Sequence, residues 1–422
     1  MQKLSIKPSR LNGAISVPPS KSQTMRAIIF ALMAQGVSRI QNPLCSPDTE
    51  AMLCAVEQLG AKISRQEDLI EIRGVDGVLQ PPDDVIDAQN SGLVLRFIGA
   101  LAAHLPRYTV ITGDHSIRYN RPVQPLLEAL EQLGACAIST KLDGFAPIII
   151  RGPMRPGYVK MCGRDSQPVS ALLIAASFLQ GTTEIEVSDP GERPWIDLTL
   201  SWLDRFQISY ERRGYTHYHL SGGASLSGFS YTVPADFSTA TYPVAAALVT
   251  GSEITLDNLH FEDPQGDKQV IAMLQKLGAK IEVTKSSLRV MKSKLNGARL
   301  DVNDVIDALP LFATLACFAE SPTEIVGGKI ARMKESNRIS AIAAELKKMG
   351  AKVEEREDGL LVYPSQLAGA QLFSHHDHRI ALSLLVAALG AKGESTIEGY
   401  TCIAKSYPTF FQDFQKLGGG LE

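Results

Sequence analysis

One short pattern recurs along this 422-residue chain and constrains its fold more than any other feature. Five copies read VEQLGAKI, LEQLGACAI, LQKLGAKI, LKKMGAKV and FQKLGGGL, with their glycines at Gly60, Gly134, Gly278, Gly350 and Gly418. A weaker copy, LDRFQISY, surrounds Asp204, and the six copies lie about seventy residues apart. Each copy predicts an amphipathic helix that ends at a C-terminal glycine and is followed by a strand.

A second element recurs in step with the first. Six apolar, alanine-rich stretches each begin at a polar cluster, and the polar residues that open them are Ser20, Ser91, Asp165, Asp236, Asp307 and Asp377. Serine and aspartate cap helix N-termini, so each stretch predicts a helix that begins at its polar residue. These helices are apolar all round and therefore have to be enclosed by the rest of their domain. Six repeats in a chain of this length predict two domains of three repeats each.

Composition narrows the functional classes. The chain is 45% hydrophobic and 21% charged, and its net charge of −3 argues against broad nucleic-acid binding. Its six cysteines are scattered without a zinc or disulfide spacing, which favours reduced thiols in a cytoplasmic protein. No apolar run reaches membrane-spanning length and no signal core opens the chain, so we expect no membrane association.

The run His375-His376-Asp377-His378 allows two interpretations, a metal site or the start of a buried helix. It lies where the other five copies place a capping residue. Adjacent residues on a helix point in different directions, unlike the i, i+4 pairs that bind metals. We therefore interpret the run as a helix start and predict no metal site.

The six helix starts favour an anionic ligand. Helix N-termini carry unpaired N–H groups and partial positive charge, and basic residues lie at or near these positions. Arg96 and Arg379 lie in the first turns of apolar helices, where a buried guanidinium needs an anionic partner. Asp307 and Glu335 lie among the cations. Each fits general acid–base chemistry, but Asp307 also fits a simple helix cap and Glu335 an ordinary surface residue.

Seven segments, in order, resemble one known family. They are PPSKSQTMRA, NSGLVLRFIGAL, TGDHSIRYNRPV, SQPVSALL, MKESNR, HDHRIA and AKSYPTFF. Together they resemble the 5-enolpyruvylshikimate-3-phosphate synthase family over essentially the whole chain. The resemblance implies an α/β (α+β) fold, a two-domain inside-out barrel. Each domain would contain three βαβαββ-like repeats with buried helices, hinged around a central cleft. It places one domain at 18–234 and the other at 1–17 plus 235–422.

The resemblance also implies an activity. Members of this family transfer the enolpyruvyl group of phosphoenolpyruvate to the 5-hydroxyl of shikimate 3-phosphate and release phosphate. The reaction is an addition followed by an elimination, and it implies no cofactor. The expected catalytic residues are Asp307, Glu335 and Lys21. The expected phosphoenolpyruvate ligands are Lys21, Gly92, Arg121, Gln167, Arg338, Arg379 and Lys405. The expected shikimate 3-phosphate ligands are Lys21, Ser22, Arg26, Ser166, Gln167, Asp307 and Lys334. We expect a monomer that is sensitive to glyphosate, because Gly92 lies where sensitive members need a small residue.

Four residues depart from the family pattern. Asp165 and Glu192 stand where phosphate-binding serines are common, Ile330 replaces an asparagine, and Trp195 replaces a tyrosine or histidine. Two carboxylates near a phosphate would repel it unless they turn away or pair, for instance with Arg164 or Arg193. Two alternatives therefore stay open: an enzyme similar to UDP-N-acetylglucosamine enolpyruvyl transferase, and a non-catalytic relative that binds these ligands.

Overall fold

The computed structural model describes residues 2–422, and these residues divide into two compact units. The N-terminal unit is Pro19–Val233. The C-terminal unit combines residues 2–18 with Pro234–Glu422. Each unit contains three four-stranded sheets and its own hydrophobic core.

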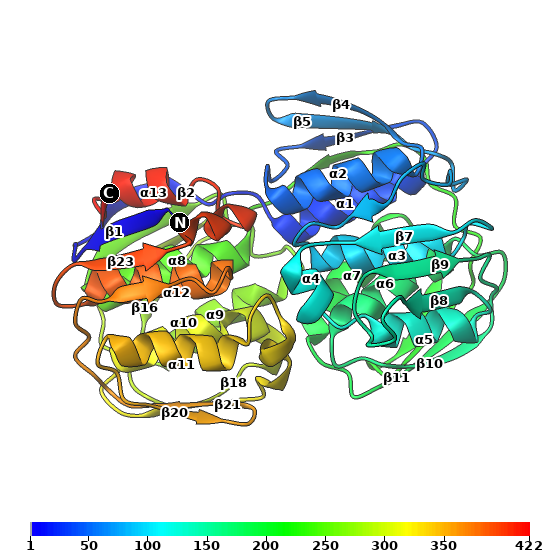
Figure 1. Cartoon of the computed structure of the whole chain (residues 1–422). Coiled ribbons are helices and arrows are strands. Elements are labelled where there is room, and N and C mark those ends of the chain that lie inside the picture. The colour runs from blue at the N-terminus through cyan, green and yellow to red at the C-terminus, as the bar shows by residue number, and fades with distance from the viewer. Residues whose placement is uncertain (1) are drawn as a thin grey trace. The chain divides into compact units, whose positions relative to one another are not determined.

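Three sheets belong to the N-terminal unit, and each is given in spatial order (Figure 1). The first is β14 (Ser230–Thr232), β3 (Val37–Gln41), β5 (Leu69–Arg73) and β4 (Lys62–Gln66). The second is β6 (Ile86–Asp87), β7 (Thr109–Thr112), β9 (Ile148–Arg151) and β8 (Cys136–Ser139). The third is β10 (Tyr158–Cys162), β11 (Thr183–Ser188), β13 (His217–Leu220) and β12 (Tyr210–Arg213).

The C-terminal unit has three sheets of the same pattern. The first is β2 (Asn12–Ser16), β15 (Glu253–Asp257), β17 (Ser287–Met291) and β16 (Lys280–Val283). The second is β18 (Arg299–Asp301), β19 (Thr323–Val326), β21 (Gly359–Val362) and β20 (Val353–Arg356). The third is β22 (Gln371–Phe373), β23 (Ser395–Glu398), β1 (Lys3–Lys7) and β24 (Gly420–Leu421).

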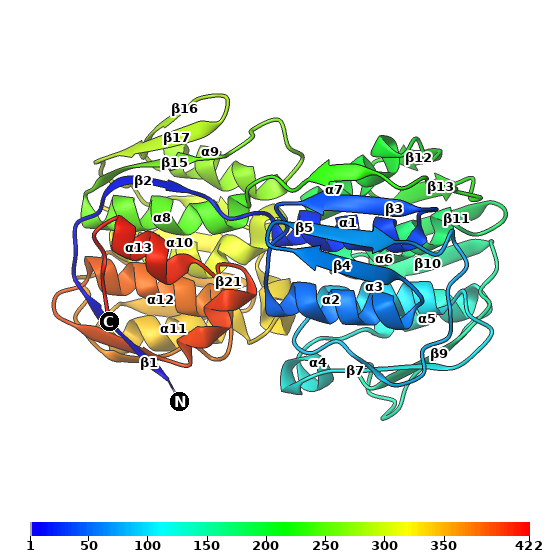
Figure 2. The same cartoon turned by 90° about the horizontal axis from the view of Figure 1, so that it is seen from above.

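All six sheets share one pairing pattern. The first two strands of each sheet are parallel and are joined to the rest by antiparallel pairs. Three sheets take a strand from a distant part of the chain: β14 completes the first sheet of the N-terminal unit, and β1 and β2 complete sheets of the C-terminal unit. Figure 2 shows β2 running beside β15, with which it pairs from Asn12 to Ser16.

Six helices form the interior of the units. They are α1 (Lys21–Met33), α3 (Gly92–Ala102), α6 (Ser166–Ser177), α8 (Phe237–Thr250), α10 (Leu309–Cys317) and α12 (His378–Gly390). Helix α3 packs on α6, and α12 packs on α8 and α10. Almost every side chain of these helices is buried, as expected for helices without a polar face.

Five of the six predicted caps are confirmed. The side chains of Ser20, Ser91, Asp165, Asp236 and Asp377 each accept a hydrogen bond from a backbone N–H in the first turn. Asp307 fitted either a cap or acid–base chemistry, and the structure shows that it does not cap a helix. Helix α10 begins after Ala308 without a side-chain cap, and Asp307 belongs to the preceding 3₁₀ helix Asn303–Ala308.

A second set of helices follows the repeated glycine pattern. These amphipathic helices are α2 (Pro47–Gln58), α5 (Gln124–Gln132), α7 (Arg193–Arg205), α9 (Gln269–Lys276), α11 (Arg338–Lys348) and α13 (Phe410–Lys416). Five of them end two residues before a glycine with φ between 87° and 105°. After α7 the same left-handed position is held by Gln207, with φ 54°. This conformation suits glycine and strains most other residues.

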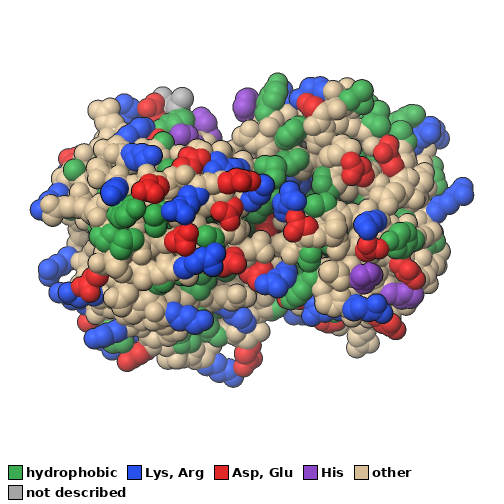
Figure 3. Space-filling model, turned by 90° about the horizontal axis from the view of Figure 1, so that it is seen from below, with side chains coloured by type: hydrophobic (Ala, Val, Ile, Leu, Met, Phe, Trp, Pro, Cys, Tyr) green, Lys and Arg blue, Asp and Glu red, His purple; other side chains and the backbone are tan. Residues whose placement is uncertain are grey.

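The remaining helices are short. They are α4 (His115–Tyr119) and the 3₁₀ helices Gly266–Lys268, Asn303–Ala308, Lys329–Met333 and Tyr400–Lys405. Among residues 2–422, no helix combines the length and the apolar composition needed to cross a membrane. On the face drawn in Figure 3, Lys and Arg side chains alternate with Asp and Glu side chains, and neither sign of charge forms a continuous patch.

Candidate active site

Asp307 lies between two arginines in the C-terminal unit. Its Oδ1 accepts a hydrogen bond from Arg338 Nη1 at 2.6 Å, and its Oδ2 accepts one from Arg379 Nη2 at 3.0 Å. Arg338 is the first residue of α11 and Arg379 lies in the first turn of α12, so two helix starts deliver the two guanidinium groups. Pro310 at the start of α10 lacks an N–H, which reduces the need for a cap there. The carboxylate of Asp307 instead accepts hydrogen bonds from the two arginines.

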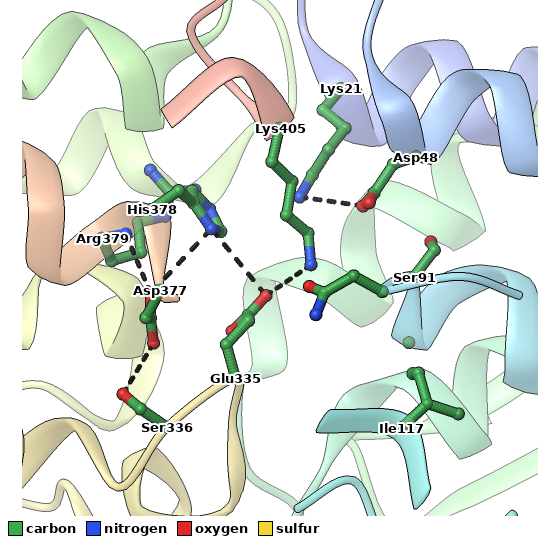
Figure 4. A network of polar contacts seen from close by, with 12 residues as sticks. Lys21, Asp48, Ser91, Ile117, Glu335, Ser336, Asp377, His378, Arg379 and Lys405 are labelled. Carbon is green, nitrogen blue, oxygen red and sulfur yellow. Dashed lines mark hydrogen bonds and ion pairs between the residues drawn. The ribbon is translucent and has the colours of Figure 1, made fainter. Parts of the chain in front are cut away.

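Arg338 is the centre of a larger buried network, part of which is drawn in Figure 4. Its Nε donates to Asp377 Oδ2 at 2.8 Å and its Nη2 donates to Glu335 Oε2 at 2.7 Å. The other oxygen of Glu335 accepts from Lys405 Nζ at 2.8 Å. Charge-assisted bonds of this kind are the strong ones in proteins, and a forked guanidinium fits several carboxylates at once.

Asp377 is a member of this network that the sequence interpretation missed. We expected it to cap α12, which it does, but it also binds Arg338 and accepts from the hydroxyl of Ser336 at 3.0 Å. Its partner Arg338 is 39 residues away in the sequence. A capping aspartate carries no local signal for a second, tertiary role.

The network fixes the charge of its members. Burial alone would raise the pKa of Asp307, but Arg379, Arg338 and Lys334 outweigh it and hold the pKa well below the usual carboxyl value. Burial opposes the charge of Arg338 as well, and Asp377, Glu335 and Asp307 more than compensate, so its pKa lies well above the usual value. The pKa of Arg379 is raised in the same way, mainly by Asp307 against the effect of burial.

One group of side chains has the composition of a metal site. Ligand atoms of Glu335, Asp377 and His378 lie within 4.8 Å of one another. However, both carboxylates already bind cationic groups of Arg338, and Glu335 also binds Lys405. A metal ion would have to displace these cations, so the donor set suits ion pairing better than metal binding. His375 lies elsewhere, with Nε2 2.9 Å from Glu345 Oε1.

A second convergence of predicted ligands lies in the N-terminal unit, around Gly92. A Cβ added at Gly92 would lie 2.7 Å from Arg96 Nη1, 2.8 Å from Arg121 Nη1 and 3.0 Å from Gln167 Oε1. Arg121 is only 4% exposed. The structure therefore brings Gly92, Arg121 and Gln167 together, and the absence of a side chain at Gly92 is what leaves room for the other groups.

The buried arginine of α3 has a carboxylate partner within its own unit. Arg96 Nη2 lies 2.9 Å from Asp165 Oδ2, and its Nη1 donates to Gln167 Oε1 at 2.9 Å. The anion that Arg96 requires is thus supplied by the protein, whereas we had attributed it to a ligand. Lys21, at the start of α1, also meets a carboxylate, with its Nζ 3.3 Å from Asp48 Oδ2.

Arg26 differs from Arg96, Arg338 and Arg379 because its hydrogen-bond acceptors are neutral. Its Nε and Nη2 donate to Thr199 Oγ1 at 3.0 and 2.8 Å, and its other donors meet the carbonyl oxygens of Ser22 and Trp195. The guanidinium also lies over the Phe97 ring. Burial without a carboxylate lowers the pKa of Arg26 to about 9.

Glu192 and Ser166 form a direct pair. Glu192 Oε2 accepts from the backbone N–H of Ser166 at 3.0 Å and from its hydroxyl at 3.1 Å. Of the pairings suggested for the two unusual carboxylates, the one with Arg164 does not form, because Arg164 pairs with Asp189, and Asp165 pairs with Arg96.

The remaining sequence-predicted residues are placed as follows. Lys334 is buried directly after the 3₁₀ helix Lys329–Met333 and contributes to the low pKa of Asp307. Ile330 is buried in the core of the C-terminal unit. Trp195 lies in the first turn of α7, and its carbonyl oxygen accepts from Arg26.

Comparisons with known proteins show to which family the chain belongs. The family model described as EPSP synthase (3-phosphoshikimate 1-carboxyvinyltransferase) matches residues 6–414. A 3-phosphoshikimate 1-carboxyvinyltransferase of Chlamydia caviae is 43% identical over 99% of this chain and 94% of its own length. One from Acetivibrio thermocellus is 39% identical over 99% of both chains.

Solved structures agree as well. An EPSP synthase from Acinetobacter baumannii superposes with a TM-score of 0.83 at 28% identity, covering 100% of this chain and 99% of its own. The mixed α/β fold that the resemblance implied is the fold of that enzyme. On the evidence of the family model and of these full-length relatives, the chain belongs to the EPSP synthase family.

Proposed function

We propose that this protein transfers the carboxyvinyl group of phosphoenolpyruvate to the 5-hydroxyl of shikimate 3-phosphate and releases phosphate. Family membership supports the reaction. The observation that carries the proposal is the position of Asp307 between Arg338 and Arg379, because it combines a carboxylate with two groups that bind oxyanions.

Because of the two arginines, the basicity of Asp307 depends on whether a ligand is bound. With both guanidinium groups bound to it, Asp307 is ionised but a weak base, since its pKa is far below neutral. Phosphoenolpyruvate carries a carboxylate and a phosphate, and both compete for Arg338 and Arg379. As these contacts move to the substrate, Asp307 regains basicity and can accept the proton of the acceptor hydroxyl.

The reaction balances without a redox step. A proton adds to the methylene carbon of phosphoenolpyruvate, and the acceptor oxygen attacks the adjacent carbon after losing its own proton. Loss of a proton from the new methyl group then expels phosphate and restores the double bond. Carboxylates of Asp307 and Glu335 stabilise the positive character at the attacked carbon. We assign proton exchange at the methylene carbon to Lys21 and Glu335.

The other assignments follow the same chemistry. Phosphoenolpyruvate is bound by Lys21, Gly92, Arg121, Gln167, Arg338, Arg379 and Lys405. Shikimate 3-phosphate is bound by Lys21, Ser22, Arg26, Ser166, Gln167, Asp307 and Lys334. Arginine suits these carboxylate and phosphate groups because its fork binds two oxygens at once.

Gly92 supports the further proposal of glyphosate sensitivity. In Gly92→Ala the new methyl group would lie within 3.0 Å of side-chain atoms of Arg96, Arg121 and Gln167. These side chains must shift, so the variant is expected to need more glyphosate for half-inhibition and to show a raised KM for phosphoenolpyruvate. Unchanged inhibition and KM would remove Gly92 from the site.

The cysteines support the proposal of a cytoplasmic protein. All six are free thiols, as expected in a reducing compartment. We also propose that the protein acts as a monomer. Analytical ultracentrifugation at the concentrations used for kinetics tests this, and a dimer mass would refute it.

Phosphate release tests the main proposal directly. Purified protein is mixed with phosphoenolpyruvate and one of three additions: shikimate 3-phosphate, UDP-N-acetylglucosamine, or buffer. Release that depends on shikimate 3-phosphate is expected. Release with only the sugar nucleotide would assign the other enolpyruvyl transfer, and no release with either acceptor would indicate a binding protein without activity.

A further inference from the structure

Glu192 is a buried carboxylate in an unusual backbone position. It lies between β11 and α7, is 2% exposed, and has φ 48° and ψ 40°. Although it occupies the cap position of α7, its side chain makes no capping bond to that helix. The left-handed backbone instead accompanies a side chain that reaches the start of the neighbouring helix α6. A hydrogen bond from Gly191 N–H to Gly163 O, at 3.0 Å, links the two loops beside it.

The contacts of Glu192 are those that an anionic ligand makes. One oxygen accepts both the backbone N–H and the hydroxyl of Ser166. Helix starts with a serine hydroxyl bind phosphate and carboxylate through this pair of donors. In this protein the anion is a side chain of the chain itself.

The neighbouring carboxylate, Asp165, accepts from another donor of the same helix start. Asp165 caps α6 through the N–H of Gln167 and forms an ion pair with Arg96. The guanidinium of Arg96 therefore balances the charge of Asp165. This ion pair explains how a carboxylate is tolerated at this helix start. Glu192 accepts from the other donors of this helix start, the N–H and the hydroxyl of Ser166.

We infer that Glu192 is a specificity-determining residue that occupies the Ser166 donors in the free protein and competes with the phosphate of the acceptor for them. This inference rests on the proposed function, which assigns Ser166 to shikimate 3-phosphate. A phosphate carries more charge than a carboxylate and would be repelled by it at this distance. The acceptor therefore binds only when Glu192 releases the Ser166 donors. The strength of the hydrogen bonds between Glu192 and Ser166 then sets the affinity for the acceptor.

The arrangement has a physical advantage for the free protein. The first turn of α6 keeps its N–H group satisfied when no ligand is bound. The result is a weaker but more selective acceptor site, since a ligand has to displace an anion that is already in place.

The test compares Glu192→Gln, which keeps the shape and removes the charge, with Glu128→Gln as a matched control. Glu128 is an exposed carboxylate on α5 of the same unit, so both variants change the net charge equally. Binding of shikimate 3-phosphate is measured by calorimetry, and the KM of both substrates is measured by phosphate release. In Glu192→Gln, shikimate 3-phosphate should bind roughly ten-fold more tightly, with the KM for phosphoenolpyruvate nearly unchanged. Glu128→Gln should behave as the wild type.

A double variant separates competition from a general charge effect. In the Ser166→Ala background, the gain from Glu192→Gln should be clearly smaller, because the hydroxyl, one of the two contested donors, is gone. If Glu192→Gln folds poorly, Glu192→Asn is the second variant, since asparagine tolerates the left-handed backbone.

Two results would overturn the inference. Unchanged or weaker binding of shikimate 3-phosphate in the folded Glu192 variants would show that the carboxylate does not compete with the acceptor. A gain that persists in full without the Ser166 hydroxyl would show that the competition is not for Ser166. Failure of the proposed function looks different, because the wild type itself would then release no phosphate with shikimate 3-phosphate.

Discussion

The two units differ in the partners that they provide for their buried cationic side chains. In the C-terminal unit, Arg338 and Arg379 bind carboxylates of the same unit. In the N-terminal unit, Arg96 and Lys21 also have carboxylate partners, but Arg26 has only neutral acceptors. The C-terminal network resembles a set of groups that exchange partners during a reaction. The environment of Arg26 resembles a fixed recognition element, because neutral acceptors hold its geometry without neutralising its charge.

The comparison predicts where loss of a carboxylate is most harmful. Asp307→Ala is expected to lower kcat by about 10³-fold or more, since a general base and a stabilising charge are lost together. The KM for phosphoenolpyruvate should not rise, because the variant frees Arg338 and Arg379 for the substrate. Steady-state phosphate release measures both. Asp257→Asn, an exposed carboxylate of the same unit, is the control. A variant with near-normal kcat would exclude Asp307 as the base.

The lysine of the N-terminal unit allows catalysis and stability to be separated. Lys21→Ala is expected to lower turnover by about 10²- to 10³-fold while the fold persists. Asp48, which is 3% exposed, then loses a cation, so the melting temperature should fall. Adding Asp48→Asn should restore part of the melting temperature but not the activity. Restored turnover in the double variant would mean that Lys21 serves only to neutralise Asp48.

Arg26→Lys tests the recognition element. Lysine keeps the charge but cannot reproduce the forked contact to Thr199 and Trp195. The KM for shikimate 3-phosphate is expected to rise by roughly ten-fold, and the KM for phosphoenolpyruvate should stay near its wild-type value. Equal changes in both constants would contradict a role for Arg26 in acceptor recognition.

The low pKa of Asp307 predicts a pH-dependent contribution to stability. A carboxyl group whose folded pKa is depressed stabilises the fold above its unfolded pKa of about 3.9, and the contribution declines as pH falls below that value. Asp307→Asn should therefore be less stable than the wild type at pH 7, on the order of 1 kcal/mol, and this difference should shrink below about pH 4. Denaturant unfolding from pH 7 to pH 3 measures it. A difference that stays constant or grows in acid would mean that the ion pairs do not stabilise the fold.

The smallest predicted effect concerns the one repeat that lacks a helix-ending glycine. Gln207 has φ 54° where the other five repeats place glycine, so Gln207→Gly should relieve strain. We expect a gain of about 0.5 kcal/mol in the free energy of unfolding, because the greater freedom of glycine in the unfolded chain offsets part of the relief. A loss of stability would show that the Gln207 side chain contributes more than its backbone strain costs.

Much of the fold follows from local sequence. Ser20, Ser91, Asp165, Asp236 and Asp377 were predicted as caps, and they cap, because capping depends on residues within one turn. The glycine after each amphipathic helix is equally local. For Asp307 the sequence left two roles open, because its residue type fits a cap as well as acid–base chemistry and only its distant partners separate them.

The site was harder to predict from the sequence than the fold was. The contacts of Asp307 join residues 31 and 72 positions apart, and no periodic pattern encodes them. The seven family motifs supplied those residues through resemblance. They did not supply Asp377 as a partner of Arg338, or the bond from Ser166 to Glu192, because such pairings depend on how separate repeats pack.

The strands β1 and β2 have a consequence for the order in which the protein is made. Residues Lys3–Lys7 and Asn12–Ser16 leave the ribosome well before their partners, because β15 is synthesised more than two hundred residues later and β23 and β24 later still. The continuous segment Pro19–Val233 is complete in the meantime and can fold during translation. Strands β1 and β2 therefore stay unpaired until these partners have been synthesised, β2 until β15 and β1 until β23 and β24.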